Sequence, residues 1–400
     1  MAMETVLPTP QLPGYAEELA RAESHIADLE VRRRSHPGDL EKRLRLAYRL
    51  FHLASLTGSI AHFEAVDAAI RETLEQFGPK EDLCLLKANL DFRFHRLEDV
   101  RRDLGMCPQL AGRFEGRALL ADLDFQEGRY RAARLELERL IAENRTWDNL
   151  ARLAHWESKL GDVSEADRLY EAAEDELTAK QMQSYAWLEL QRGVLALTHG
   201  RSADAGNHYQ RADKAFPGHW YTDEHLAELR ATEGKLDGAV ALFRRAIARA
   251  PKPELQQALG ELYLISGRPE EAQPWLDSAL TTYLRSVEDG GVHYFHHLAD
   301  FYSDARDEPT EAVKWARKDI AMRSNFSTQA AMAWALYRNG QLSQAVQYIR
   351  LALSSGVRDA RIFSIAATIF EALGDAAESQ NYAQMALRIN PGHRDFHMHH

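Results

Sequence analysis

The residues best suited to chemistry lie close together in the segment VHYFHHLADFYSD, residues 292–304. If this segment is helical, its spacing places four candidate ligands on one side of the helix. They are His293, His296, Asp300 and Asp304. Imidazole nitrogens and carboxylate oxygens in this arrangement could bind Zn²⁺ or another divalent ion, or begin an acid–base site. The alternative is that these side chains only pack and form hydrogen bonds on a polar surface, because histidine pairs at helical spacing are common.

Signatures of the common enzyme classes are missing from the sequence. It has no glycine-rich loop followed by lysine and serine, no nucleophilic serine between glycines, and no paired cysteines at metal-binding spacing. Residues 393–400 are rich in histidine, and we expect them to form a frayed tail that binds metal only weakly. We therefore predict a protein that is not an enzyme and has no cofactor, with a divalent metal at the histidine cluster as the alternative.

The composition favours a helical protein that does not bind nucleic acid or membranes. The net charge of −11 disfavours non-specific binding to either of these anionic partners. Cys84 lies in an apolar stretch and is expected in the core, whereas Cys107 follows a break and is expected to be exposed. Two cysteines cannot form a disulfide framework and suit a reducing compartment. Since we also find no secretory signal and no apolar run of membrane-spanning length, we expect a cytoplasmic location.

A glycine recurs along the chain at intervals close to 34 residues. Most of these glycines are followed five residues later by alanine, and twelve residues later by a small or apolar residue. The glycines are Gly128, Gly161, Gly200, Gly234, Gly267, Gly340 and Gly374. One glycine is missing from the series, near Arg306. This period predicts stacked pairs of helices, because one pair cannot bury its apolar face without its neighbours.

Residues 253–286 illustrate the predicted unit. Leu255 and Leu259 belong to an apolar stripe at helical spacing, which predicts the first helix of the pair. Gly260 lies inside that helix, where glycine costs about 1 kcal/mol relative to alanine, so its presence implies the close approach of another helix. Gly267 then provides the left-handed cap that ends the helix. The sequence therefore predicts an all-α fold.

The predicted organisation is one elongated solenoid from residue 37 to residue 392. We expect residues 1–14 to be disordered, residues 15–36 to form a capping helix, and residues 393–400 to form the histidine-rich tail. The predicted units begin near residues 44, 81, 114, 147, 186, 220, 253, 292, 326 and 360. Two of them are longer than the rest, and we interpret the extra residues as joints within one body, not as domain boundaries.

The unit at residues 253–286 resembles the tetratricopeptide repeat family. The residues at the spacing of the signature positions of that family are Leu259, Gly260, Tyr263, Gly267, Ala272 and Ala279. The resemblance extends over residues 114–391 and weakens toward the N-terminus. It implies a right-handed superhelix of helix–turn–helix repeats, in which the first helices of successive units line a concave face where ligands usually lie.

Transferred to this chain, the concave positions form an acidic groove that also carries aromatic side chains. The groove residues we select are Trp187, Tyr221, Glu224, Glu228, Glu254, Glu261, His293, His296, Asp300, Asp304, Trp334, Tyr337 and Arg338. Earlier units place Asp122, Phe125, Asp148 and His155 at the same positions. Acidic grooves with aromatic anchors suit segments that bear lysine or arginine. We therefore predict a scaffold or adaptor that binds a basic protein segment, although a merely solvated charged face would have a similar composition.

Two other functions remain open from the sequence. The cluster at residues 293–304 could belong to a metal-binding protein or an accessory protein of a metallo-enzyme. The exposed end of the helical stack could also mediate self-association, because terminal units of such arrays need a polar cap.

Overall fold

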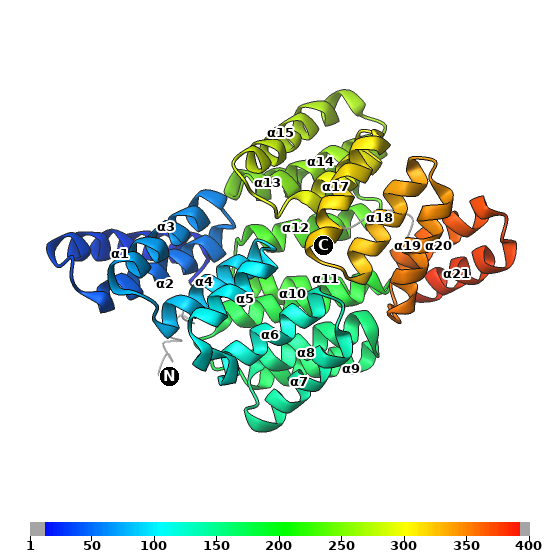
Figure 1. The fold of residues 1–400 in the computed structure, drawn as a ribbon. Helices are drawn as coiled ribbons and strands as arrows, with labels where there is room; N and C mark the ends of the chain where they lie inside the picture. Colours follow the sequence, from blue (N-terminus) through cyan, green and yellow to red (C-terminus); the bar gives the residue numbers. More distant parts are fainter. Residues whose placement is uncertain (1–12, 393–400) are drawn as a thin grey trace, which may run out of the picture.

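The computed structural model describes residues 13–392 as a stack of helices (Figure 1). Within these residues there are 21 α-helices and no strand, which confirms the predicted all-α fold. The helices α1 to α4 lie at one end of the view and α20 and α21 at the other, with α10 and α12 near the middle. Residues 1–14, which we expect to be disordered, lie largely outside the described residues, and the histidine-rich tail at residues 393–400 lies wholly outside them. Both expectations stay predictions.

After α1 (Tyr15–Ser35), consecutive helices pack as antiparallel pairs. The first helices of the pairs are α2 (Leu40–Thr57), α4 (Glu81–Arg93), α6 (Phe114–Gln126), α8 (Trp147–Leu160), α10 (Met182–Thr198), α12 (Trp220–Thr232), α14 (Pro253–Ile265), α16 (Phe295–Asp300), α18 (Phe326–Arg338) and α20 (Ala360–Leu373). The second helices are α3 (Ile60–Phe77), α5 (Leu97–Met106), α7 (Tyr130–Glu143), α9 (Val163–Asp175), α11 (Ser202–Ala215), α13 (Leu236–Arg249), α15 (Pro269–Glu288), α17 (Pro309–Met322), α19 (Leu342–Ser354) and α21 (Ala376–Ile389). None of the helices between residues 13 and 392 combines the length and the apolar composition that a membrane span requires.

The turn inside most pairs contains a residue in the left-handed region of backbone space. Gly128 and Gly340 adopt φ values of 78° and 72° there, a conformation that costs a residue with a Cβ atom about 1–2 kcal/mol. In two turns another residue takes this conformation: His95 at φ 57° and Asp307 at φ 52°. Asp307 follows Arg306, where the glycine series is interrupted. The hairpin geometry is thus kept even where the glycine is absent.

Small residues let the two helices of a pair approach closely. The alanines that follow the turn glycines are fully buried: Ala133, Ala166, Ala205, Ala239, Ala272 and Ala345. A Cβ atom on Gly260 would lie 2.6 Å from the side chain of Leu276, and one on Gly193 would lie 2.2 Å from the ring of Tyr209. Both distances are shorter than van der Waals contact, so these positions have room only for glycine. This confirms the close helix approach predicted at Gly260.

The pair formed by α16 and α17 differs from the others. The helix α16 has only six residues and continues into a π-helix, Phe301–Ala305. The preceding α15 is 20 residues long and ends just before Gly290. Because a π-helix turns more widely than an α-helix, Asp304 does not follow Asp300 in the α-helical register that the sequence analysis assumed.

The two cysteines form a disulfide within the pair α4–α5. Their Cα atoms are 6.4 Å apart, and Cys84 and Cys107 are 0% and 5% exposed. The prediction that Cys107 is exposed is therefore wrong, because the hairpin brings the end of α5 back beside α4. The cysteine-based argument for a reducing compartment no longer holds.

The solenoid curls back on itself, so that the turns of early pairs contact residues that begin or precede later pairs. We call this contact the seam. Hydrogen bonds across it include those from Trp220 Nε1 to the Leu56 carbonyl (3.0 Å) and from Asn325 Nδ2 to the Gln126 carbonyl (3.0 Å). Two others run from the Phe326 amide to the Tyr130 hydroxyl (2.8 Å) and from the Arg358 amide to the Lys159 carbonyl (2.9 Å). The bonded residues are as far as 199 positions apart in the sequence. The seam joins turns of early pairs to later pairs, a contact that the 34-residue pattern alone does not predict.

Candidate functional site

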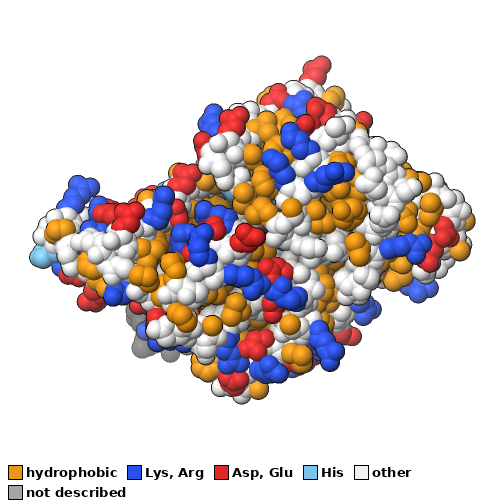
Figure 2. Space-filling model, viewed as in Figure 1, with side chains coloured by type: hydrophobic (Ala, Val, Ile, Leu, Met, Phe, Trp, Pro, Cys, Tyr) orange, Lys and Arg blue, Asp and Glu red, His pale blue; other side chains and the backbone are white. Residues whose placement is uncertain are grey.

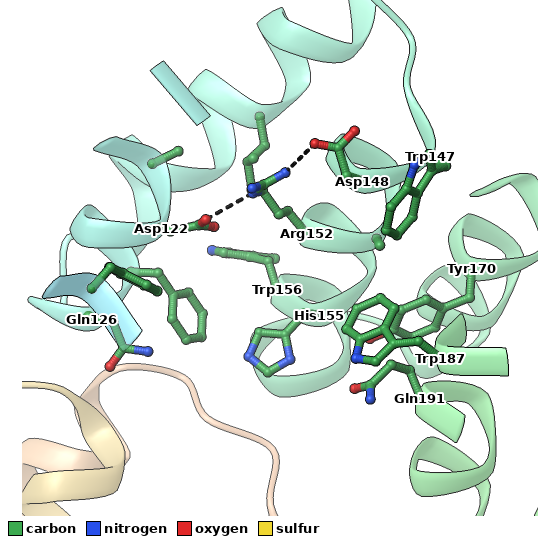
Figure 3. Close-up of a pocket in the computed structure, with 15 residues that line it drawn as sticks. Asp122, Gln126, Trp147, Asp148, Arg152, His155, Trp156, Tyr170, Trp187 and Gln191 are labelled. Carbon is green, nitrogen blue, oxygen red and sulfur yellow. Dashed lines mark hydrogen bonds and ion pairs between the residues drawn. The ribbon is translucent and has the colours of Figure 1, made fainter. Parts of the chain in front are cut away.

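The helices α6, α8 and α10 line a pocket on the interior side of the solenoid (Figure 3). Its volume is about 370 Å³, within the range of natural ligand sites. The lining residues are Phe92, Ala121, Asp122, Phe125, Gln126, Leu137, Trp147, Asp148, Ala151, Arg152, His155, Trp156, Tyr170, Trp187 and Gln191. Four successive units therefore contribute to this site, with Phe92 of α4 added to the residues of the next three.

Six of the residues that line the pocket are Phe, Tyr or Trp. The rings of Trp147 and Trp187 meet edge to face, with centroids 6.2 Å apart and an interplanar angle of 69°. Trp156 is fixed by the hydrogen bond that its Nε1 donates to the Tyr130 carbonyl, at 3.0 Å. Trp187 is 38% exposed, whereas most large apolar side chains of the fold are buried. The pocket thus presents aromatic surface that the fold itself does not cover.

One arginine pairs with both carboxylates of the pocket. Arg152 Nε lies 2.9 Å from Asp122 Oδ2, and Arg152 Nη1 lies 2.7 Å from Asp148 Oδ2 (Figure 3). Asp148 and Arg152 are four residues apart on α8, and Asp122 comes from the neighbouring α6. Burial raises the pKa of Asp122 in spite of the arginine. Each carboxylate therefore already has a cationic partner within the protein.

The imidazole of His155 contributes a polar group to the aromatic wall. It packs against Phe125, with ring centroids 5.4 Å apart, and Figure 3 shows it beside Trp187. Among the described residues, its ring nitrogens have no hydrogen-bond partner. The surrounding protein atoms and, to a smaller extent, the positive charge of Lys159 lower its pKa to about 4, although part of the side chain is exposed. At neutral pH the ring is uncharged and offers one N–H donor and one nitrogen acceptor to the pocket.

Only one residue of the selected groove set, Trp187, lines this pocket. On α12, Glu224 is 8% exposed and Glu228 is fully buried, so neither side chain lies open to a ligand. Glu228 Oε2 lies 3.0 Å from Nδ1 of His225, which is also fully buried. Burial raises the pKa of Glu224 to about 7. The prediction that these two carboxylates line an exposed groove is wrong, because α12 lies in the centre of the fold. Tyr221, at the start of the same helix, is partly buried with its ring 4.4 Å from that of His225.

The two glutamates selected on α14 are partly buried. Glu254 Oε1 lies 3.5 Å from Lys252 Nζ, and Glu261 Oε1 accepts a hydrogen bond of 2.8 Å from Gln257 Nε2. Both carboxylates therefore have polar partners within the protein.

The acids of the later units are paired with arginines. Arg361 Nη2 lies 3.7 Å from Asp300 Oδ1 and 3.8 Å from Asp304 Oδ2. Asp304 also accepts a hydrogen bond of 2.9 Å from Trp334 Nε1 and lies 3.7 Å from Arg338 Nη1. Basic and acidic side chains are correspondingly interspersed on the face in Figure 2. The acidic excess predicted for this stretch is therefore largely neutralised by neighbouring units. The Trp334 ring stacks on that of Tyr337, with centroids 5.4 Å apart.

The histidine cluster lies at the seam. The ring of His293 contacts Phe94 at 5.1 Å and that of His296 contacts His95 at 5.2 Å, both distances between centroids. Across residues 13–392, no group of three or more His, Cys, Asp or Glu side chains has the geometry to hold a metal ion. Since His293, His296, Asp300 and Asp304 do not form such a group, we do not propose the metal-binding alternative.

The seam histidines should make the protein less stable in acid. Burial lowers the pKa of His95 and His296 well below the usual value, and Arg323 contributes in both cases. Below about pH 6.5 the unfolded chain binds protons that the folded protein does not, so each such histidine costs about 1.4 kcal/mol of stability per pH unit. Between about pH 6 and about pH 5, the free energy of unfolding of His296→Gln should therefore fall by about 1 kcal/mol less than that of the wild type.

Urea denaturation at several pH values measures this difference. The control is His25→Gln, which changes an exposed side chain of α1 and should follow the wild type. If His296→Gln and the wild type lose stability equally, the seam histidines do not carry the acid sensitivity.

Sequence reasoning missed most of the pocket. It placed Asp122, Phe125, Asp148 and His155 at concave positions but did not select them, and it gave no role to Arg152. The spacing of four between Asp148 and Arg152 was the available signal, because it predicts an ion pair on one helix face. The contribution of Asp122 from another unit depends on the packing between units.

Comparison with known proteins gives one family. The tetratricopeptide repeat family matches residues 190–254 and 225–285. No curated protein matches the sequence. The matched residues run from α10 to α15 and so cover three consecutive helix pairs.

Several solved structures are similar to this chain. The pilF protein of Pseudomonas aeruginosa is 21% identical over 53% of this chain and 94% of that chain, with a TM-score of 0.32. The Cut9–Hcn1 hetero-tetramer of APC/C is 14% identical over 94% of this chain and 81% of that chain, with a TM-score of 0.43. A tetratricopeptide repeat protein from Parabacteroides merdae is 17% identical over 61% of this chain and 93% of that chain, with a TM-score of 0.38. The family match thus covers residues 190–285, and the helix pairs and turn glycines of the other described units follow the same pattern.

Proposed function

We propose that this protein is a non-catalytic scaffold or adaptor that binds a segment of a partner protein inside its solenoid. Tetratricopeptide repeat proteins generally act as protein-interaction scaffolds. The observation that carries the proposal for this chain is the pocket of about 370 Å³ between α6, α8 and α10. Its accessible tryptophan, Trp187, is the kind of side chain that dominates binding energy at protein interfaces.

We further propose that the bound segment carries lysine or arginine outside the pocket. The net charge of −11 favours basic partners through the overall field of the protein, which raises the rate of association. The acids of the interior helices have partners within the protein, such as Lys252 for Glu254 and Arg361 for Asp300, so the preference for a basic segment rests on the overall field. A second candidate function is self-association through the C-terminal end of the stack. There, Ala386 is the only buried residue of α21, so this helix leaves most of its surface uncovered.

Capture from native lysate tests the proposal with two matched variants. The double variant Trp147→Ala plus Trp187→Ala removes the edge-to-face pair of the pocket and should reduce partner capture at least about ten-fold, since interface tryptophans are worth about 2 kcal/mol or more. The control Leu135→Ala truncates a side chain on α7 that is 43% exposed and does not line the pocket, and it should capture the partner normally.

Circular dichroism should first show that both variants are as helical as the wild type. If the double variant captures the same proteins at the same level, the pocket is not the binding site. Raising the salt concentration should weaken the complex, because salt screens charges at the surface. A complex that is insensitive to salt would contradict the basic character proposed for the segment.

A further inference from the structure

The charges of the pocket argue against a lysine or arginine as its occupant. Arg152 already bonds both Asp122 and Asp148, at 2.9 and 2.7 Å. An incoming cation would have to compete with this arginine for the same carboxylates and would also be repelled by it. Like charges in a protein interior repel strongly because the surroundings screen them weakly. The two carboxylates and one arginine keep one excess negative charge, but an uncharged occupant is the one that leaves both ion pairs intact.

The shape and chemistry of the wall favour an aromatic ring. Trp147, Trp187 and Phe125 present ring faces and edges to the cavity, and rings prefer edge-to-face or offset contact with other rings. The volume of about 370 Å³ accommodates a large side chain without rearrangement. An aliphatic side chain would fill the space but would not use the ring geometry.

The imidazole of His155 adds a requirement for a polar atom on that ring. Its ring nitrogens have no hydrogen-bond partner among the described residues, whereas Asp122, Asp148 and Arg152 bond one another. Its N–H group can donate to a hydroxyl oxygen, and its second nitrogen can accept from a hydroxyl or an indole N–H. A phenylalanine ring in the pocket would leave both groups of His155 without a partner.

Building on the proposed function, we propose that the pocket binds a tyrosine or tryptophan side chain of the partner segment, with the hydroxyl or indole N–H hydrogen-bonded to His155. Trp147 and Trp187 provide the walls that contact the ring. The basic residues of the segment bind outside the pocket. The pocket therefore holds the aromatic side chain, and the negative field of the protein favours segments that carry positive charge.

Small amide probes test this assignment on the purified full chain without any partner. The probes are N-acetyl-tyrosinamide, N-acetyl-phenylalaninamide and N-acetyl-lysinamide, and the readout is the indole N–H signals of the seven tryptophans in nitrogen–proton NMR spectra. Signals assigned to Trp147 and Trp187 should shift with the tyrosine probe at a Kd on the order of 1 mM, as expected for a ligand of this size. The phenylalanine probe should bind about five-fold more weakly, because it leaves His155 unpaired.

The variant His155→Phe separates the hydrogen bond from the packing. It keeps a ring in the wall, so the tyrosine and phenylalanine probes should bind it with nearly equal affinity. Trp187→Ala should weaken both probes about ten-fold or more. Trp275→Ala, which changes a partly buried tryptophan of α15 outside the pocket, should affect neither.

The proposal is overturned if the lysine probe binds as tightly as the tyrosine probe, if no probe shifts Trp147 or Trp187, or if His155→Phe still prefers the tyrosine probe. These outcomes are separate from those of the capture experiment. Probes that bind as expected together with capture that ignores the pocket would reject the scaffold role but keep the pocket chemistry. The reverse combination would keep the scaffold role and reject the tyrosine or tryptophan anchor.

Discussion

Gly128→Ala should open the seam, whereas Gly340→Ala should leave it closed. Both glycines occupy hairpin turns with almost the same backbone, at φ 78° and 72°. A Cβ atom on Gly128 would lie 2.6 Å from the carbonyl oxygen of Ser324, which belongs to a later pair, whereas a Cβ atom on Gly340 would have nothing within 4 Å. The two variants share the backbone strain and differ in the clash across the seam.

The clash has to be relieved by moving main-chain atoms next to two hydrogen bonds of the seam. Asn325 Nδ2 donates to the Gln126 carbonyl at 3.0 Å, and the Phe326 amide donates to the Tyr130 hydroxyl at 2.8 Å. Gly340→Ala should cost about 1 kcal/mol, the strain of a left-handed alanine. Gly128→Ala should cost about 2–3 kcal/mol, because it also weakens these hydrogen bonds and their packing.

Small-angle scattering and thermal denaturation measure the two effects. Gly128→Ala should increase the radius of gyration and lower the melting temperature more than Gly340→Ala does. Because helix pairs contact mainly their neighbours in sequence, far-ultraviolet circular dichroism should remain unchanged in both variants. Equal radii and equal melting temperatures for the two variants would mean that the seam does not hold the turns together.

Glu228→Lys should unfold the central part of the solenoid. Glu228 is fully buried on α12 and forms a hydrogen bond of 3.0 Å with His225, whose ring stacks on that of Tyr209. A lysine there would place a longer, oppositely charged side chain beside a buried histidine. Leaving a buried charge without its partner typically costs about 3–5 kcal/mol, a large part of the stability of most proteins.

Urea denaturation of Glu228→Lys and Glu261→Lys separates burial from charge. Both substitutions change the net charge equally, but Glu261 on α14 is only partly buried, so its replacement should cost about 1 kcal/mol. The milder variant Glu228→Gln keeps the size and one hydrogen-bonding oxygen and should fall between them. A Glu228→Lys protein as stable as Glu261→Lys would show that the side chain at residue 228 reaches solvent.

The candidate site was predictable only in part, for a reason that particular residues make clear. The resemblance to the tetratricopeptide repeat placed Trp187 and His155 on interior faces, whereas helical spacing alone shows only which residues share a face. The same resemblance selected Glu228 as a groove residue, although α12 lies in the centre where its neighbours cover that side chain. It also counted Asp300 as free acid, because the pairing arginine, Arg361, lies two helix pairs further along the chain.

By itself, the sequence determined the local architecture: helix pairs, their glycine turns, and the alanines and glycines that let paired helices touch. These features follow from contacts within about 34 residues, and a repeated pattern records them directly. Only the tertiary structure decided that the solenoid closes at the seam, that Cys84 meets Cys107, and that one arginine joins two units at the pocket. Small rotations between successive units add up over the stack, and they decide which residues almost 200 positions apart come into contact.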